Sequence, residues 1–209
     1  MERIKHRVFV SYHHANDQKY KEALIKWSEK YGIFEDWSVH PGDIPDDWDD
    51  EAIRVEIRDN YLRSSSVTIL LVGTDTWGRK HVDWELYSSM RDSEKNKKSG
   101  IVVIMLPSTG CSKVYAAHDG EKTEVFSNIP SDGWHSVSSH EQCVRDYPNL
   151  PERIIDQIMA PNAKVSIANW NDIYPYYPER LATLIDNAYN HRESCDYDMS
   201  RRMRRRNSN

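Results

Sequence analysis

Glu85 is the residue in this 209-residue chain whose type and position best suit chemistry. It lies in the segment from Trp77 to Glu85, just after the predicted start of a helix. On a helical wheel Val82, Leu86 and Met90 cluster on one side, and Glu85 lies at the edge of that apolar cluster. Its carboxylate would therefore be half sheltered. The alternative is a glutamate that only favours the helix N-terminus through the helix dipole, and sequence position alone favours this simpler interpretation.

Several familiar chemistries lack their motifs. Neither GxGxxG nor GxxxxGK[ST] occurs, so a dinucleotide fingerprint and a P-loop are unsupported, and there is no GxSxG nucleophile elbow. Ser11-Tyr12-His13-His14 stands where a response-regulator-like phosphoacceptor site would need acidic residues. His135, His140 and Cys143 have a spacing that matches no standard metal site, so we interpret them as loop residues and predict no metal.

The elements that must position Glu85 alternate between strands and helices. Strands are predicted at 7–12, 67–72, 101–106 and 165–168, and helices at about 16–31, 46–62, 82–95 and 177–190. Residues 67–72 and 101–106 are continuous apolar runs, typical of strands buried on both faces. This order predicts an α/β, flavodoxin-like doubly wound parallel sheet. Ligands of such sheets bind beyond the carboxyl ends of the strands, here residues 11–14, 35–46, 73–81 and 107 onward.

The length and the charge pattern predict one domain over residues 1–192, followed by a tail over 193–209. Residues 107–163 lack periodicity and are rich in Pro, Gly, Ser and Asn, which predicts a long, mostly irregular insertion before the last strand and helix. The tail contains five arginines: Arg201, Arg202, Arg204, Arg205 and Arg206. We expect this tail to be solvated and disordered, the alternative being an electrostatic tether to nucleic acid or a partner.

Composition and charge argue against several classes of ligand and location. The net charge is −5, and the chain without its arginine-rich tail is more acidic still, so nucleic acid is an unlikely main ligand. Three cysteines far apart predict neither a disulfide framework nor a thiolate zinc site. No apolar stretch approaches the roughly 20 residues of a membrane span, and no signal-peptide apolar region follows Met1. We therefore expect a cytoplasmic protein that does not bind membranes.

Four segments together resemble a known family in their order and spacing. They are Arg-Val-Phe-Val-Ser-Tyr at 7–12, the Asp-rich loop at 36–46, Ser-Val-Thr-Ile-Leu-Leu-Val-Gly-Thr at 66–74, and the helix with Trp77, Trp84 and Glu85. The chain resembles a TIR-like domain of the DUF1863 branch, which includes the TIR-type protein of the Thoeris bacterial anti-phage system. The resemblance covers about residues 6–106 and implies a flavodoxin-like fold.

The resemblance also implies an activity and a site. Catalytic members cleave NAD at the nicotinamide–ribose bond, and in Thoeris-like members the ADP-ribose part becomes a signal nucleotide that activates a separate effector. The catalytic glutamate of the family falls on Glu85. The implied substrate-binding residues follow the strands: Ser11, Tyr12 and His13, then Asp43 in the loop from Asp36 to Asp46, and Thr74 and Trp77. NAD would be a substrate, and no cofactor is implied.

One carboxylate is enough for this reaction. Glycosidases usually need a second carboxyl group to protonate a poor leaving group. Nicotinamide in NAD is already cationic at its nitrogen and departs neutral, so no general acid is required. What remains is to orient the ribose hydroxyls and stabilise the oxocarbenium-like charge at C1′, which an ionised glutamate does electrostatically. Attack by a nucleotide hydroxyl or a second small molecule gives a cyclic or conjugated product.

Two other functions remain open at this stage. A non-enzymatic TIR-like interaction module would recruit a partner through residues 36–46 and the exposed stripe of the second helix. A nucleoside or nucleotide transferase on the same fold is a weaker alternative. Trp84 points away from the apolar cluster of its helix and could lie in a self-association surface. The expected partners are therefore NAD, a second copy of the chain, and an effector reached through a diffusible nucleotide.

Overall fold

A five-stranded parallel sheet forms the centre of the protein in the computed structural model, which describes residues 4–39, 50–94, 96–131, 134 and 136–208. The strand order is β2-β1-β3-β4-β5. The strands are β1 (His6–Ser11), β2 (Phe34–Asp36), β3 (Val67–Val72), β4 (Gly100–Met105) and β5 (Val165–Asn169). The predicted doubly wound parallel α/β fold is thus confirmed.

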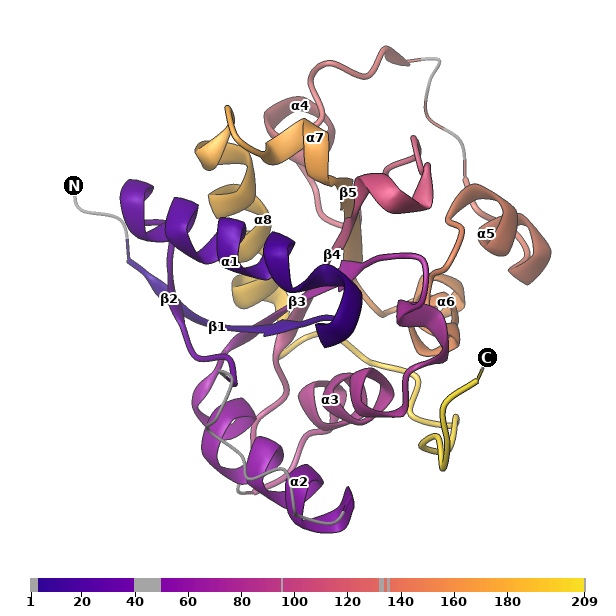
Figure 1. Cartoon of the computed structure of the whole chain (residues 1–209). Coiled ribbons are helices and arrows are strands. Elements are labelled where there is room, and N and C mark those ends of the chain that lie inside the picture. The colour runs from indigo at the N-terminus through magenta and orange to yellow at the C-terminus, as the bar shows by residue number, and fades with distance from the viewer. Residues whose placement is uncertain (1–3, 40–49, 95, 132–133, 135, 209) are drawn as a thin grey trace.

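Helices connect the strands and cover both faces of the sheet (Figure 1). The longer ones are α1 (His14–Tyr31), α3 (Lys80–Met90), α6 (Glu152–Met159) and α8 (Pro178–His191). The shorter ones are α2 (Asp50–Glu56), α4 (Glu121–Glu124), α5 (His140–Asp146) and α7 (Trp170–Ile173). None of these described helices combines the length and apolar character that a membrane span requires.

Alternate residues of the central strands face two separate cores. Val67, Ile69 and Leu71 of β3 pack with α1 and α8, while Leu70 and Val72 of the same strand pack with α3 and α6. Because β3 is buried on both sides, its sequence is a continuous apolar run instead of an alternating one. The core that includes Leu70 and Val72 packs α3 against the sheet, and α3 carries Glu85.

The region between β1 and β3 contains a strand that the sequence did not reveal. The sequence predicts no strand between residues 12 and 67, yet Phe34–Asp36 pairs in parallel with residues 6–8 at the edge of the sheet. A three-residue edge strand is too short to show a period. After α2 the helix continues as a π-helical segment at Ile57–Tyr61 and ends in a 3₁₀ turn at Leu62–Ser64. Asp43 lies outside the described residues.

The insertion between β4 and β5 is more regular than the sequence indicated. Within residues 107–163 the chain forms α4, α5 and α6. Ile154, Ile155 and Ile158 of α6 are buried in the core beside α3. Three short helices separated by irregular loops give only weak periodicity, which explains why this segment reads as irregular.

The prediction of a disordered C-terminal tail is wrong for residues 193–208, which pack along the body of the domain. Cys195 and Tyr197 are buried in the core shared with α3 and α6, and the Tyr197 hydroxyl donates to the Ser99 carbonyl at 3.0 Å. Further along, the Ser208 amide donates to the Gly78 carbonyl at 2.9 Å. The run of arginines dominated the sequence interpretation, although a few buried residues and backbone contacts are sufficient to fix the segment.

Candidate active site

The candidate site lies between β1 and β3, where the order of the strands across the sheet reverses direction. The order β2-β1-β3 places the loops after β1 and β3 side by side at the carboxyl edge, while their helices α1 and α3 leave toward opposite faces. This topological switch point is the usual ligand site of open α/β sheets. Ser11 ends β1 here, and residues 73–78 follow β3.

Glu85 and Ser11 meet at this edge. Helix α3 carries Glu85 to the end of β1, and the Ser11 hydroxyl donates to Glu85 Oε2 at 2.6 Å. Ser11 itself is buried. The contact joins residues 74 positions apart in the sequence, so the fold alone assembles it. A short hydrogen bond of this kind to a carboxylate fixes both the position and the orientation of the acid.

The Glu85 carboxylate is desolvated and has no positive partner within the described part of the chain. Burial raises the pKa of Glu85 from its ordinary value near 4.5 to about 7, and the hydrogen bond from Ser11 opposes that rise. His81, Trp84 and Ser88 lie around it on α3, and Ile57 faces them from the π-helical segment. The space among these side chains is about 10 Å³, which is the room of one water molecule.

Tyr12 and His13 lie beside this pair. Burial, and after it the charge of Glu85, raises the pKa of Tyr12 to about 12, so its hydroxyl keeps its proton. That hydroxyl contacts Gln18 Oε1 and lies 2.9 Å from His14 Nδ1. Burial lowers the pKa of His13, with the nearby Arg79 charge acting in the same direction, so His13 favours its neutral form. His13 Nδ1 is buried without a hydrogen-bond partner among the described groups.

A second carboxylate, Asp17 in the first turn of α1, belongs to no motif that singles it out in the sequence. It is buried against the end of β3, and burial raises its pKa while the Thr76 hydroxyl lowers it. Thr76 also accepts a hydrogen bond from the Gly73 amide at 2.9 Å. A Cβ on Gly73 would lie 2.4 Å from an Asp17 oxygen, so only glycine fits here. Asp17 thus supports the loop that follows β3.

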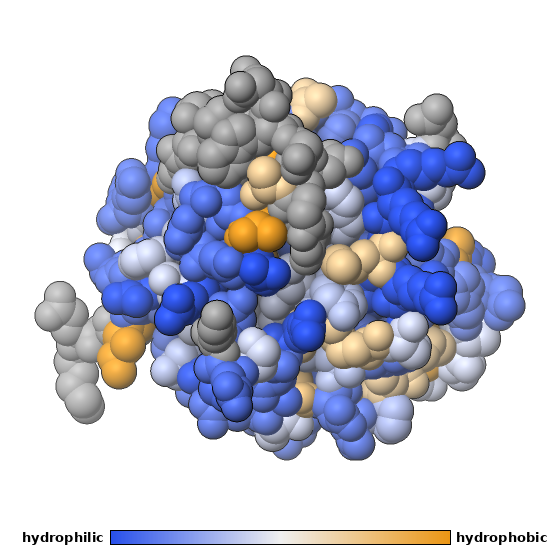
Figure 2. All heavy atoms as spheres, turned by 90° about the horizontal axis from the view of Figure 1, so that it is seen from below, coloured by the Kyte–Doolittle hydropathy of each residue, from blue (hydrophilic) through white to orange (hydrophobic). Residues whose placement is uncertain are grey.

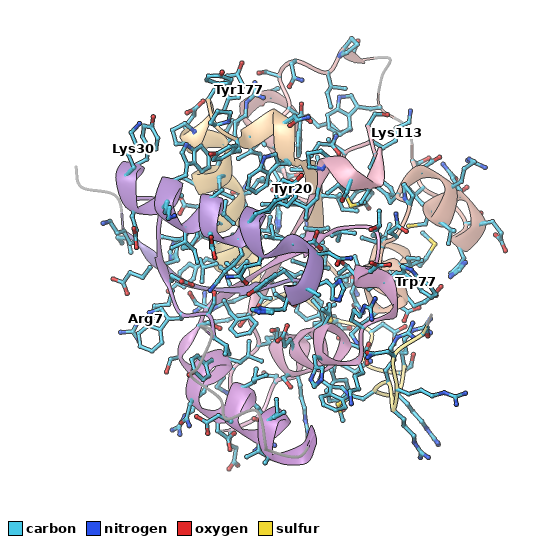
Figure 3. All side chains as sticks on the ribbon, viewed as in Figure 1. Arg7, Tyr20, Lys30, Trp77, Lys113 and Tyr177 are labelled. Atoms are coloured by element: carbon cyan, nitrogen blue, oxygen red, sulfur yellow. The ribbon has the colours of Figure 1, made fainter. Side chains whose placement is uncertain are left out.

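The other predicted binding residues are spread more widely. Thr74 is exposed on the loop after β3. Trp77 is 36% exposed and lines a different pocket, formed with the C-terminal segment and the start of α6. Figure 3 shows Trp77 beside that segment. The structure therefore brings Ser11 into contact with Glu85 and Tyr12 close enough to sense its charge, while Trp77 lines a different pocket.

The C-terminal segment covers the other side of α3 through a buried ion pair. Arg153 of α6 is fully buried, and its Nε and Nη2 atoms donate to the two oxygens of Asp83 at 2.8 and 3.1 Å. The remaining guanidinium donors reach the carbonyls of Arg201 and Arg202 at 3.1 and 3.3 Å. The Arg204 amide donates to Asp83 Oδ2 at 2.7 Å. This network fixes the tail onto the helix that carries Glu85.

Trp84 belongs to the same contact. Its indole Nε1 donates to the Arg204 carbonyl at 2.7 Å. The side chain that the sequence left free for self-association is therefore engaged by the tail of its own chain. Self-association stays a prediction and draws no support from Trp84 in this arrangement.

The fold and the edge carboxylate define a TIR-like α/β domain. Residues 9–110 match the family model described as Thoeris protein ThsB, TIR-like domain. The match runs from β1 to the turn after β4 and includes Ser11 and Glu85. A search of curated proteins finds no match to the chain. Among the described residues no group of three or more His, Cys, Asp or Glu side chains is arranged to hold a metal ion.

Proposed function

We propose that this TIR-like defence domain cleaves NAD at the nicotinamide–ribose bond, with Glu85 as the catalytic carboxylate. The observation that supports this proposal most directly is the Ser11–Glu85 hydrogen bond at the switch point of the sheet. It places an oriented and desolvated carboxylate where ligands of such sheets bind. A structural glutamate on a helix surface needs neither burial nor a partner at a strand end.

The proposed reaction uses the charge of Glu85. The bond between ribose C1′ and the nicotinamide nitrogen breaks, and its electron pair leaves with the neutral nicotinamide. An ionised Glu85 stabilises the positive charge that develops on the ribose, and it does so strongly because the site is desolvated. A hydroxyl oxygen then bonds to C1′ and releases its proton to solvent. The product is an ADP-ribose derivative, which we propose to be cyclic or conjugated and to act as a signal to a separate effector.

The burial of Glu85 gives this proposal a specific requirement. With a pKa of about 7, the carboxylate is half protonated at neutral pH. Since only the ionised form stabilises positive charge, NAD cleavage should increase as the pH rises through about 7. Ser11 favours the ionised form because its hydroxyl donates to the carboxylate.

The experiment compares Glu85→Gln with the wild-type chain and with Glu29→Gln, which changes an exposed glutamate of α1. Small molecules from cells expressing each protein, with and without phage infection, are analysed by mass spectrometry. The proposal predicts an ADP-ribose-derived species in wild type and Glu29→Gln cells, reduced at least about 100-fold in Glu85→Gln cells. Unchanged NAD and derivatives in all cells, together with phage protection that survives Glu85→Gln, would contradict it.

A non-enzymatic interaction module is the second candidate. The small size of the space beside Glu85, about 10 Å³, favours it, because a nicotinamide ring does not fit there in this conformation. An interaction module would keep its phenotype in Glu85→Gln cells and lose it when the partner-binding surface is changed. The same set of cells therefore separates the two functions.

A further inference from the structure

A pocket on the far side of α3 has the features of an anion site. It has a volume of about 210 Å³ and lies between the first turn of α3, the start of α6 and the C-terminal segment. Trp77, Pro151 and two acidic residues line it together with five arginines: Arg79, Arg153, Arg201, Arg202 and Arg204. Figure 2 shows strongly hydrophilic side chains on the side of the molecule where Figure 1 places the C-terminus.

Two of these arginines are already neutralised. Arg153 forms the buried pair with Asp83. Arg201 binds the Asp156 carboxylate through Nε and Nη2 and lies 3.3 Å from Glu152 Oε2. The acidic residues of the pocket, Asp83 and Glu152, are thus engaged by arginines that belong to the framework. They leave the other arginines to determine the charge of the cavity.

Among the remaining arginines, the side chains of Arg202 and Arg204 form no ion pair within the described residues, and Arg79 forms a long one with Asp75. The Arg204 guanidinium donates to neutral acceptors, the Ser208 hydroxyl and the Trp77 carbonyl. The Arg202 side chain is exposed and forms no ion pair within the described residues. The Arg79 Nη2 atom is 3.9 Å from Asp75 Oδ2, and Arg79 Nε donates to the backbone carbonyl of Asp75 at 3.2 Å. Arginine heads held apart by neutral contacts are well suited to bind the oxygens of a phosphate.

We propose that this pocket binds the phosphate groups of a small ligand, a free diphosphate or the diphosphate of a nucleotide. The volume of about 210 Å³ suits a diphosphate and is below the roughly 300–1,000 Å³ of sites that enclose larger ligands whole. Arg202, Arg204 and Arg79 supply the donors, and the exposed ring of Trp77 supplies a surface for a base. The site is separate from Glu85 and does not depend on the proposed NAD cleavage.

The test measures binding of inorganic pyrophosphate and of ADP to the full chain by calorimetry at low ionic strength. The pocket variant is Arg202→Gln/Arg204→Gln. The matched control is Arg205→Gln/Arg206→Gln, which removes the same charge from the same segment outside the pocket lining. The wild-type chain should bind pyrophosphate with a dissociation constant below about 1 mM. The pocket variant should bind about tenfold more weakly or worse, and the control should stay within about threefold.

Further measurements keep the test decisive. Arg202→Gln alone removes a side chain without a described contact, so it leaves the fold intact and should still weaken binding several-fold. Glu85→Gln should bind pyrophosphate like the wild-type chain, which keeps this site distinct from the catalytic proposal. Tighter binding of ADP than of pyrophosphate would identify a nucleotide as the source of the phosphates, and equal binding a free diphosphate. Equal weakening by both double variants would show diffuse charge attraction and overturn the proposal. Binding of an oligonucleotide, together with no binding of pyrophosphate or ADP, would also overturn it.

Discussion

Asp83 and Glu85 are two carboxylates two residues apart on the same helix, and the protein surrounds them in opposite ways. Asp83 receives two hydrogen bonds from the buried guanidinium of Arg153 and one from the Arg204 amide. Glu85 receives one hydrogen bond, from the neutral hydroxyl of Ser11. Asp83 is buried, and Glu85 is half-buried with a desolvated carboxyl group. Within the described part of the chain, a positive charge lies beside Asp83 and none lies beside Glu85.

The difference teaches how one helix separates a structural acid from a reactive one. A buried carboxylate with a bidentate arginine is electrostatically satisfied and holds elements together. A desolvated carboxylate without a neighbouring cation has a raised pKa, because nothing nearby compensates the negative charge of its ionised form. A cationic transition state beside Glu85 would supply that charge, whereas Asp83 has no such capacity left. Changes to either set of partners should therefore have distinct signatures.

The largest expected effect on stability comes from Arg153→Ala. It leaves the Asp83 carboxylate buried without its cation, and we expect the free energy of unfolding to fall by about 3–5 kcal/mol in urea denaturation. Arg145→Ala, which removes an exposed arginine next to Asp146, should cost less than about 1 kcal/mol. The double variant Arg153→Ala/Asp83→Ala should recover part of the loss. Equal costs for the two single arginine variants would refute the structural role of the pair.

The pH dependence of stability tests the other side of the comparison. Because the folded-state pKa of Glu85 is about 7 and its ordinary value is 4.5, the folded protein keeps a proton that the unfolded chain releases between these values. Glu85 therefore lowers stability as the pH rises from about 4.5 to 7, by about 3 kcal/mol in total. Glu85→Gln lacks this term, so its stability relative to wild type should increase by that amount between pH 4 and pH 8. Parallel pH profiles for the two proteins would mean that the carboxylate is solvated.

Removal of the Ser11 hydroxyl should have a smaller effect, confined to high pH. Ser11→Ala deletes the donor to the ionised Glu85, and hydrogen bonds to charged groups contribute about 1.5–3 kcal/mol. We expect the loss of stability at pH 8 to exceed the loss at pH 5, and the pKa of Glu85 to rise further. Ser11→Thr keeps a hydroxyl and should restore most of the difference. A loss independent of pH would show that Ser11 acts through packing instead.

The smallest effect is expected for Trp84→Phe on the tail-covered side. The ring volume is largely kept, while the indole donor to the Arg204 carbonyl is lost. The expected cost is about 1 kcal/mol, or a fall in melting temperature of roughly 2–4 °C for a chain of this size. Trp134→Phe removes an indole without a described hydrogen bond and should cost less. An oligomer that dissociates on Trp84→Phe would instead restore Trp84 to a self-association surface.

The sequence predicts the central strands and the longer helices of this protein well, because these elements depend on local patterns. The continuous apolar runs that become β3 and β4 are unambiguous, and the alternation with helices leads directly to a parallel sheet. Glu85 was found at the edge of an apolar helix face, which is again a local signal. The three-residue β2 and the short helices of the insertion offer too few residues for such a signal.

The contacts that make Asp83 a structural residue and Glu85 a candidate catalytic one could not be predicted from the sequence. Ser11 and Glu85 are 74 positions apart, and Asp83 and Arg153 are 70 apart. No periodicity links such pairs, since only the packing of α3 against β1 and α6 brings them together. Asp17 shows the same limit, because its role depends on the Gly73 backbone that lies over it. The arginines of the tail suggested a solvated end, although the backbone of that segment is what α6 and α3 bind.

The order of synthesis gives the C-terminal segment a further meaning. Domains begin to fold from their N-terminal part while the ribosome is still adding residues. The sheet and α3 are translated well before Arg201, Arg202 and Arg204, whose backbone groups complete the surroundings of Arg153 and Asp83. Until then this ion pair lacks three of its hydrogen-bond partners, and the Gly78 carbonyl lacks the hydrogen bond from the Ser208 amide. The helix that bears Glu85 therefore reaches its finished setting only after translation has passed Ser208, so copies released before that point would lack it.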